Sequence, residues 1–222
     1  FNALSTAQVS GLAETQLASL TATMLGSLPS TKIGALSTSA LRGLTASQAA
    51  ALSTTQFTAL GASKIAAMSS SAVAALSNTA LATLTTTQLS SADFAAAWAS
   101  ALTATQIGSF TTTQIGAMSS TLINGFTADQ VAELSTSGFA ALTASQIGAF
   151  STSAITGLTT TQIDQMTHTQ LGGLKATQIG SLTTTDIGHL EADDIAAMTI
   201  TQLAGLVLVQ LRSLTDTQVT AF

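Results

Sequence analysis

Residues 158–163 read Leu-Thr-Thr-Thr-Gln-Ile and combine two signals for the start of a helix. Thr159 followed three residues later by Gln162 is a capping box. In it the hydroxyl accepts a hydrogen bond from the third helical amide, and the glutamine side chain reaches back to the amide of the capping residue. Leu158 and Ile163 flank this box and occupy the two positions of a hydrophobic staple. The stretch therefore predicts a helix that begins directly after Thr159.

The same pattern returns every eight residues along the chain. Octapeptides begin on a large apolar residue from Leu4 to Leu84, and again from Phe94 to Leu214. Position one of the octapeptide is Leu, Met or Phe in all 27 copies, position six is Ile, Leu, Val or Phe in 25, and position five is Gln in 15. This regularity predicts a single repeat array over residues 1–222 rather than a set of globular domains.

One octapeptide is irregular. The copy that begins at Leu84 contains a two-residue insertion within 84–93, in the stretch Ser90-Ser91-Ala92-Asp93. The next copy carries Trp98 and Ala99 where Gln and Ile are usual. We interpret the insertion as a bulge or kink in a continuous array, with a domain boundary or a docking site as the alternative. We expect Trp98 to fill space beside the bulge rather than to form a binding platform.

The length of the repeat limits each helix to one or two turns, because the next capping residue follows after eight residues and a turn takes about 3.6. One continuous helix would need apolar residues at a mean spacing near that value, whereas here the spacings alternate between five and three. Helices this short are unstable alone, so neighbouring octapeptides must stack to stabilise them. We predict an all-α solenoid of one helix per octapeptide. The sequence does not fix the number of octapeptides per superhelical turn, and three is our guess.

A β-solenoid is the alternative fold, because hydroxyl triplets such as Thr85-Thr86-Thr87 favour strands. Positions one and six have opposite parity, so a straight strand cannot point both toward one core. A turn inside each octapeptide could align them, yet the usual Asn and Gly turn signals are sparse. The pattern therefore favours the helical solenoid.

Composition excludes several classes of function. The formal net charge is -5, and the five cations Lys32, Arg42, Lys64, Lys175 and Arg212 form no patch, which disfavours nucleic-acid binding. The chain has no cysteine, so it forms no disulfide and no thiolate site. No apolar stretch approaches the ~20 residues of a membrane-spanning helix. We expect a soluble chain without a membrane span.

No arrangement of residues predicts catalysis, cofactor binding or a metal site. The only histidines, His168 and His189, have no fixed spacing to a serine or a carboxylate, and we expect exposed side chains. Four carboxylates gather within nine residues, and we expect a solvated acidic surface there, with calcium binding as the alternative. These carboxylates belong to Asp186, Glu191, Asp193 and Asp194. We therefore predict no catalytic, cofactor-binding or metal residue and no enzyme activity.

The consensus Leu-Thr-Thr-Thr-Gln-Ile-Gly followed by Ser or Ala resembles the octapeptide arrays of very large bacterial surface proteins of the haemagglutinin- or adhesin-like type. The resemblance covers the whole chain and implies an extracellular or cell-surface location. We expect a structural protein that self-associates into a filament, fibre or stalk. Phe1 and Phe222 lie at the edges of the array without polar capping segments, which suggests contacts with further repeats or other copies. The alternative is an adhesin segment that binds a cell-surface glycan, ice or another surface through rows of Thr and Ser.

Overall fold

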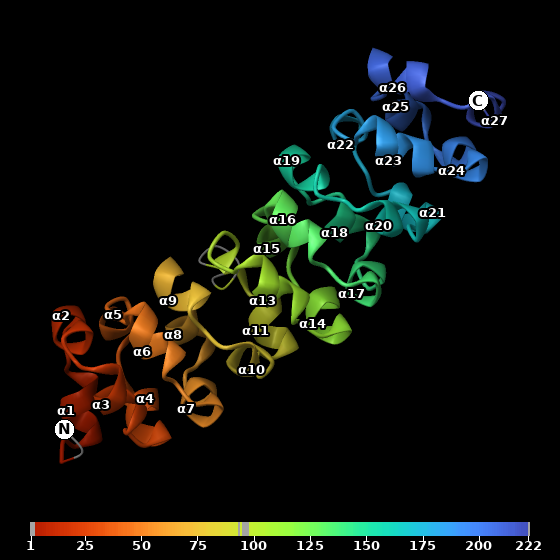
Figure 1. Ribbon diagram of the computed structural model, residues 1–222. Helices are drawn as coiled ribbons and strands as arrows, with labels where there is room; N and C mark the ends of the chain where they lie inside the picture. Colours follow the sequence, from red (N-terminus) through yellow and green to blue (C-terminus); the bar gives the residue numbers. More distant parts are fainter. Residues whose placement is uncertain (1–2, 93, 95–97, 222) are drawn as a thin grey trace. The chain divides into compact units, whose positions relative to one another are not determined.

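The computed structural model describes residues 3–92, 94 and 98–221, and within them it contains 26 short helices and no strand (Figure 1). The all-α prediction is confirmed for these residues, and the β-solenoid alternative is wrong. Contacts divide the chain into an N-terminal body, Phe1–Phe110, and a C-terminal body, Thr111–Phe222. The expectation about Phe1 and Phe222 concerns residues outside the described ranges.

The helices follow one another at the spacing of the octapeptides. Those described in the N-terminal body are α1 (Thr6–Ser10), α2 (Glu14–Ala18), α3 (Ala22–Gly26), α4 (Ser30–Ala35), α5 (Thr38–Leu41), α6 (Ala46–Ala50), α7 (Thr54–Thr58), α8 (Ala62–Ala66), α9 (Ser70–Ala74), α10 (Asn78–Leu81), α11 (Thr86–Ser90) and α13 (Ala104–Gly108). Those in the C-terminal body are α14 (Thr112–Gly116), α15 (Ser120–Asn124), α16 (Ala128–Ala132), α17 (Thr136–Ala140), α18 (Ala144–Ile147), α19 (Thr152–Ile155), α20 (Thr160–Asp164), α21 (His168–Leu171), α22 (Ala176–Ile179), α23 (Thr184–His189), α24 (Ala192–Ala197), α25 (Ile200–Leu203), α26 (Leu208–Ser213) and α27 (Asp216–Val219).

Helix α20 shows how the repeated sequence starts each helix. Thr159 is extended, with φ -87° and ψ 155°, and its amide donates to Gln162 Oε1 at 2.9 Å. The Gln162 amide donates in return to Thr159 Oγ1 at 3.2 Å. The amide of Ile163 then makes the first i to i-4 bond of the helix, to Thr159 O at 3.0 Å. The capping box predicted from residues 158–163 is therefore present.

The same repeat also ends the helix after about one turn. The Met166 amide closes α20 with an i to i-3 bond to Ile163 O at 3.0 Å. The next capping residue, Thr167, is again extended, with φ -71° and ψ 153°. Since an N-cap residue needs this extended backbone, a new cap every eight residues prevents the helix from continuing.

Helices three positions apart along the chain stack on one another. In the N-terminal body α1 contacts α4 and α4 contacts α7, and in the C-terminal body α20 contacts α23 and α23 contacts α26 (Figure 1). Each superhelical turn of a body therefore takes three octapeptides, as predicted. Stacking buries the staple residues at positions one and six, such as Leu158 and Ile163. Complete burial of each such side chain contributes about 1.5–3 kcal/mol.

None of the helices in the described part of the chain is both long enough and apolar enough to span a bilayer. This agrees with the prediction from the hydropathy of the sequence.

Candidate functional site

A ladder of buried glutamine side chains connects successive superhelical turns. Gln170 caps α21 through its Oε1 atom, which accepts from the Thr167 amide at 3.1 Å. Its Nε2 atom points in the opposite direction and donates to Phe139 O at 3.1 Å and to Leu142 O at 3.0 Å. These two carbonyls lie 31 and 28 residues earlier in the chain. One side chain therefore starts its own helix and also holds the preceding turn.

The ladder repeats in both bodies. The usual partners are the position-six carbonyl four octapeptides earlier and the position-one carbonyl three octapeptides earlier, and Gln146 differs only in donating to the position-seven carbonyl of Gly116 in place of position six. Glutamines that make bonds of this type are Gln48, Gln56, Gln106, Gln146, Gln162, Gln170, Gln178, Gln202, Gln210 and Gln218. All ten are buried. Buried polar groups need partners, and here both ends of each amide have one.

The ladder adds inter-turn donors to carbonyls at the ends of the short helices. The position-six carbonyl, such as Phe139 O, already accepts from the following position-one amide, Leu142 N, at 3.0 Å, and the glutamine is its second donor. The same glutamine amide also donates to the position-one carbonyl, such as Leu142 O. The sequence indicated the capping half of this role, while the ladder half was missed because its partners lie about 30 residues away.

Trp98 takes the place of glutamine in the irregular region. Its Nε1 atom donates to Ile65 O at 3.1 Å, the position-six carbonyl that a ladder glutamine would hold. Its ring is fully buried and lies 4.4 Å from the ring of Phe94, measured between centroids. The expectation that Trp98 fills space rather than forming a binding platform is confirmed. The irregular octapeptide lies inside the N-terminal body, and its inserted residue Asp93 is outside the described residues.

The substitution Trp98→Phe tests this substitute ladder bond. Phenylalanine keeps an aromatic ring against Phe94 but removes one of the two donors to the Ile65 carbonyl, which still accepts from the Met68 amide at 3.2 Å. We expect the free energy of unfolding to fall by about 0.5–1.5 kcal/mol. Urea unfolding followed by circular dichroism at the helical band measures the change. An unfolding curve identical to that of the parent chain would show that the Nε1 bond contributes nothing.

Both histidines lie opposite carboxylates of a neighbouring turn, which corrects the expectation that they have no fixed relation to an acid. His189 Nδ1 lies 2.8 Å from Asp164 Oδ1, and His168 Nε2 lies 3.3 Å from Asp194 Oδ1. Both rings are exposed as expected, with side-chain exposed fractions of 40% and 59%. The pairs join residues 25 and 26 positions apart, close to the 24 residues of one superhelical turn, so the relation depends on the fold.

Two members of the acidic cluster work as helix caps. Asp186 Oδ2 accepts from the Thr183 amide at 2.8 Å, and Asp194 Oδ2 accepts from the Glu191 amide at 2.9 Å. Glu191 itself makes no side-chain cap. Within the described residues no three His, Asp or Glu side chains come together as a potential metal site.

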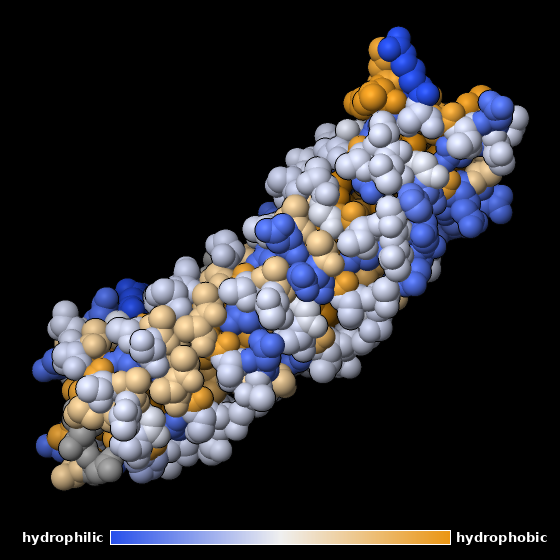
Figure 2. Space-filling view, in the orientation of Figure 1, coloured by the Kyte–Doolittle hydropathy of each residue, from blue (hydrophilic) through white to orange (hydrophobic). Residues whose placement is uncertain are grey.

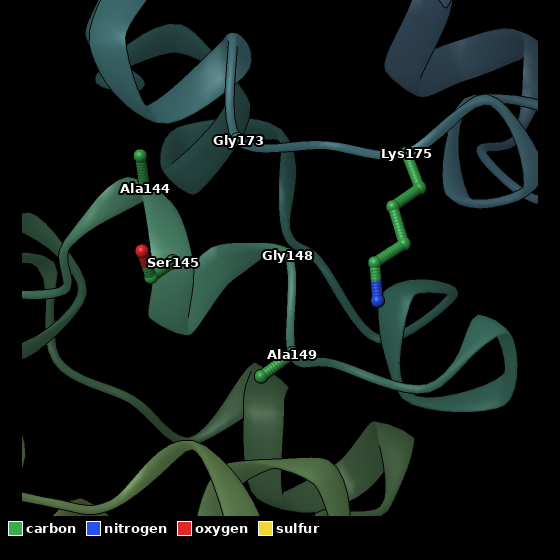
Figure 3. Close-up of a pocket in the computed structure, with 6 residues that line it drawn as sticks. All are labelled: Ala144, Ser145, Gly148, Ala149, Gly173 and Lys175. Atoms are coloured by element: carbon green, nitrogen blue, oxygen red, sulfur yellow. The ribbon is translucent and has the colours of Figure 1, made fainter.

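The C-terminal body has a shallow cavity of about 380 Å³, whose lining residues are drawn in Figure 3. Small residues line it at the place where turns meet, and Lys175 extends along one side. Its other lining residues are Ala144, Ser145, Gly148, Ala149 and Gly173. With only the Ser145 hydroxyl and the Lys175 ammonium as polar side-chain groups, this lining offers no acid-base pair for chemistry.

The outward surface of the array consists mainly of hydroxyls, with one apolar exception. Position four is exposed in every octapeptide for which it is described, and it is usually Ser or Thr. In the octapeptide that begins at Leu206, positions two to four are instead Val207, Leu208 and Val209, which are 43%, 62% and 62% exposed. Ile200 on the preceding helix is 87% exposed. We call these four residues the apolar strip, and Figure 2 shows hydrophobic surface around α26.

Comparison with known proteins gives no relative: no family model matches the chain, and no curated protein sequence matches it.

Proposed function

We propose that this chain is a structural repeat protein that self-associates side by side into a filament, fibre or stalk. The observation that carries the proposal is the apolar strip of Ile200, Val207, Leu208 and Val209. Three successive apolar side chains, Val207 to Val209, exposed on a surface made mainly of hydroxyls, are typical of an interaction site in a soluble protein. Since positions two to four are outward-facing or only partly covered in the other described octapeptides as well, the strip faces away from the core.

The ladder supports a mechanical role. In the C-terminal body, buried glutamine amides with two inter-turn hydrogen bonds each recur along the array, for example at Gln162, Gln178 and Gln218, and tie successive turns together. The stability of such arrays is a sum of nearest-neighbour terms, so a bond repeated in each turn resists opening along the whole array. A fibre component that bears tension requires this kind of distributed cohesion.

The proposed location is extracellular or at a cell surface. It rests on the resemblance of the octapeptide to the arrays of bacterial surface proteins and on a surface made of hydroxyls and amides rather than charges. Ser and Thr hydroxyls keep such a surface hydrated without a large net charge.

Electron microscopy and light scattering of the purified chain test self-association. We expect the parent chain to form elongated assemblies in a concentration-dependent manner. The variant Ile200→Thr/Leu208→Ala/Val209→Thr, which introduces the residues usual at these positions, is expected to remain dispersed at least tenfold above that concentration. The control Thr54→Ser/Thr55→Ser changes equivalent exposed positions of α7 and should assemble like the parent. Dispersed parent chains at every salt and protein concentration, or a triple variant that still assembles, would exclude the proposal.

The second candidate function is adhesion through the hydroxyl rows. It is favoured by the exposed position-four hydroxyls, such as those of Thr161, Thr169 and Thr177, which are not needed as N-caps. A glycan array and a thermal-hysteresis measurement address glycan and ice binding. Blank results in both assays would leave only the structural role.

A further inference from the structure

Asn124-Gly125 is the only Asn-Gly dipeptide in the sequence. A glycine after an asparagine lets the next backbone nitrogen approach the asparagine side chain, because glycine has no Cβ atom to obstruct it. The other two asparagines, Asn2 and Asn78, are followed by alanine and threonine, which do have a Cβ atom. Asn124 is therefore the asparagine whose sequence context most favours spontaneous loss of the side-chain amide.

The same side chain connects two turns of the C-terminal body. Asn124 is the last residue of α15, and its Nδ2 atom donates to Ala149 O at 2.8 Å, 25 residues later in the chain. Helix α15 also contacts α18, which ends two residues before Ala149. Position five of this octapeptide is Leu122, so α15 has no ladder glutamine of its own. We call the contact of α15 and Asn124 with α18 and Ala149 the α15–α18 joint.

The position of Asn124 in the repeat is suited to a donor and not to a lone carboxylate. Position seven faces the position-eight carbonyl of the next turn, since a Cβ atom on Gly116 would lie 3.4 Å from Ala141 O. Position seven is a carboxylate at Asp164, and there position eight of the next turn is His189, whose Nδ1 lies 2.8 Å from Asp164 Oδ1. Ala149 has no side-chain group that could partner a carboxylate at residue 124.

The closed joint holds both groups that would have to react. The Gly125 amide donates to Leu122 O at 3.2 Å, while the Asn124 amide donates to Ala149 O. Attack of the Gly125 nitrogen on the side chain of Asn124 requires rotation of the Asn124 backbone away from the helical conformation. Both hydrogen bonds must break first, so the reaction is confined to molecules in which the end of α15 has opened.

We propose that Asn124 is a deamidation site gated by the opening of the α15–α18 joint, and that the product keeps this joint open. In the open state the Gly125 nitrogen forms a bond to Cγ of Asn124. The Cγ–Nδ2 bond breaks, and Nδ2 leaves as ammonia with the proton from the Gly125 amide. Water then opens the succinimide ring: cleavage at Cγ gives aspartate, and cleavage at the main-chain carbonyl carbon gives isoaspartate.

Either product removes the inter-turn donor. An ionised carboxylate only accepts hydrogen bonds, and here it would face Ala149 O, which is also an acceptor. Isoaspartate in addition inserts a methylene into the main chain at the end of α15, which displaces the Gly125 amide from Leu122 O. A single irreversible reaction, with water as its only reagent, therefore weakens one joint and leaves the other turns unchanged. The reaction is independent of the self-association proposed above.

Peptide mapping by mass spectrometry of the full chain, incubated at neutral pH with and without denaturing urea, measures the reaction. We expect the peptide that contains Asn124 to be modified at least about tenfold more slowly in the folded chain than in urea. The peptide that contains Asn78 is the internal control and should react much more slowly than Asn124 in urea. Equal rates for Asn124 in the two conditions would overturn the gate, and an unmodified Asn124 in urea would overturn the site.

Hydrogen exchange of two variants measures the consequence for the joint. Asn124→Asp reproduces the aspartate product, and we expect the protection of peptides covering α15 and α18 to fall about threefold to tenfold. Asn124→Ala introduces the residue found at position seven of the next two octapeptides, Ala132 and Ala140, and should cause a smaller loss because it adds no charge. Peptides covering the stack of α23 on α26 are the internal control and should not change. Protection in Asn124→Asp equal to that of the parent chain would show that the product does not open the joint, and would overturn this part of the proposal.

Discussion

Replacement of Gln56 by alanine is expected to lower the free energy of unfolding by about 2–4 kcal/mol. The side chain is 4% exposed and its Oε1 atom accepts from the Ser53 amide at 2.9 Å. Its Nε2 atom donates to Leu25 O, Gly26 O and Leu28 O at 3.3, 3.0 and 2.7 Å. Alanine removes the cap acceptor and the inter-turn donor to three carbonyls, of which Leu25 O keeps a bond from the Leu28 amide, and it creates a cavity as well.

Gln16 provides the matched control in the same body. Its Oε1 atom accepts from the Ala13 amide at 2.8 Å, so it caps α2, but the residue is exposed and no ladder bond of its Nε2 is described. Gln16→Ala is expected to cost about 1 kcal/mol or less. The difference between the two variants, measured by urea unfolding with circular dichroism, isolates the ladder from the cap. Equal losses would mean that the ladder bonds add no stability.

Replacement of Gly157 by alanine is expected to destabilise the C-terminal body by about 1–3 kcal/mol. Gly157 follows α19 at position eight, and a Cβ atom there would overlap the backbone of Ala128, including its carbonyl oxygen. Because the obstacle is backbone rather than the end of a flexible side chain, the two turns must move apart. The thermal unfolding midpoint should fall by several degrees, since about 1 kcal/mol corresponds to 2–4 °C in a chain of this length.

Gly188 is the control for this glycine. It lies inside α23, and a Cβ atom added there would meet no heavy atom within 4 Å. Gly188→Ala should therefore stabilise the helix by about 0.5–1 kcal/mol, because alanine has less backbone entropy to lose. Two glycine-to-alanine changes in one body are thus expected to have opposite signs. A destabilising Gly188→Ala or a neutral Gly157→Ala would contradict the close approach of the turns.

The sequence predicted the parts of the fold that depend on neighbouring residues. Thr159 and Gln162 form a capping box, and Leu158 and Ile163 form a staple, through contacts that span no more than five residues. The capping box and the staple recur along the chain. The residues of one octapeptide therefore predict the helix, its length and the all-α class. The prediction of three octapeptides per turn also proved correct, although the spacing of the residues did not require that number.

The roles of the candidate site residues depended on the superhelical register and could not be read from local spacing. The octapeptide that contains Gln162 predicts only that this side chain caps its own helix. No residue nearby in the sequence indicates that its Nε2 atom donates to the carbonyls of Val131 and Leu134. His168 and Asp194 are 26 residues apart, a separation that has no meaning until the turn is known to take 24.

By itself, then, the sequence determined the helix start in octapeptides that carry the capping box and the staple, such as residues 158–163, because both are interactions within one octapeptide. Only the tertiary structure decided which side chains connect the turns, which glycines are too close to backbone to be replaced, and where the Trp98 indole takes the place of a glutamine amide. The physical reason is the difference in sequence separation between the two kinds of hydrogen bond. Local hydrogen bonds fix the conformation of a single helix, whereas the inter-turn bonds exist only after stacking brings residues 25 to 33 positions apart into contact.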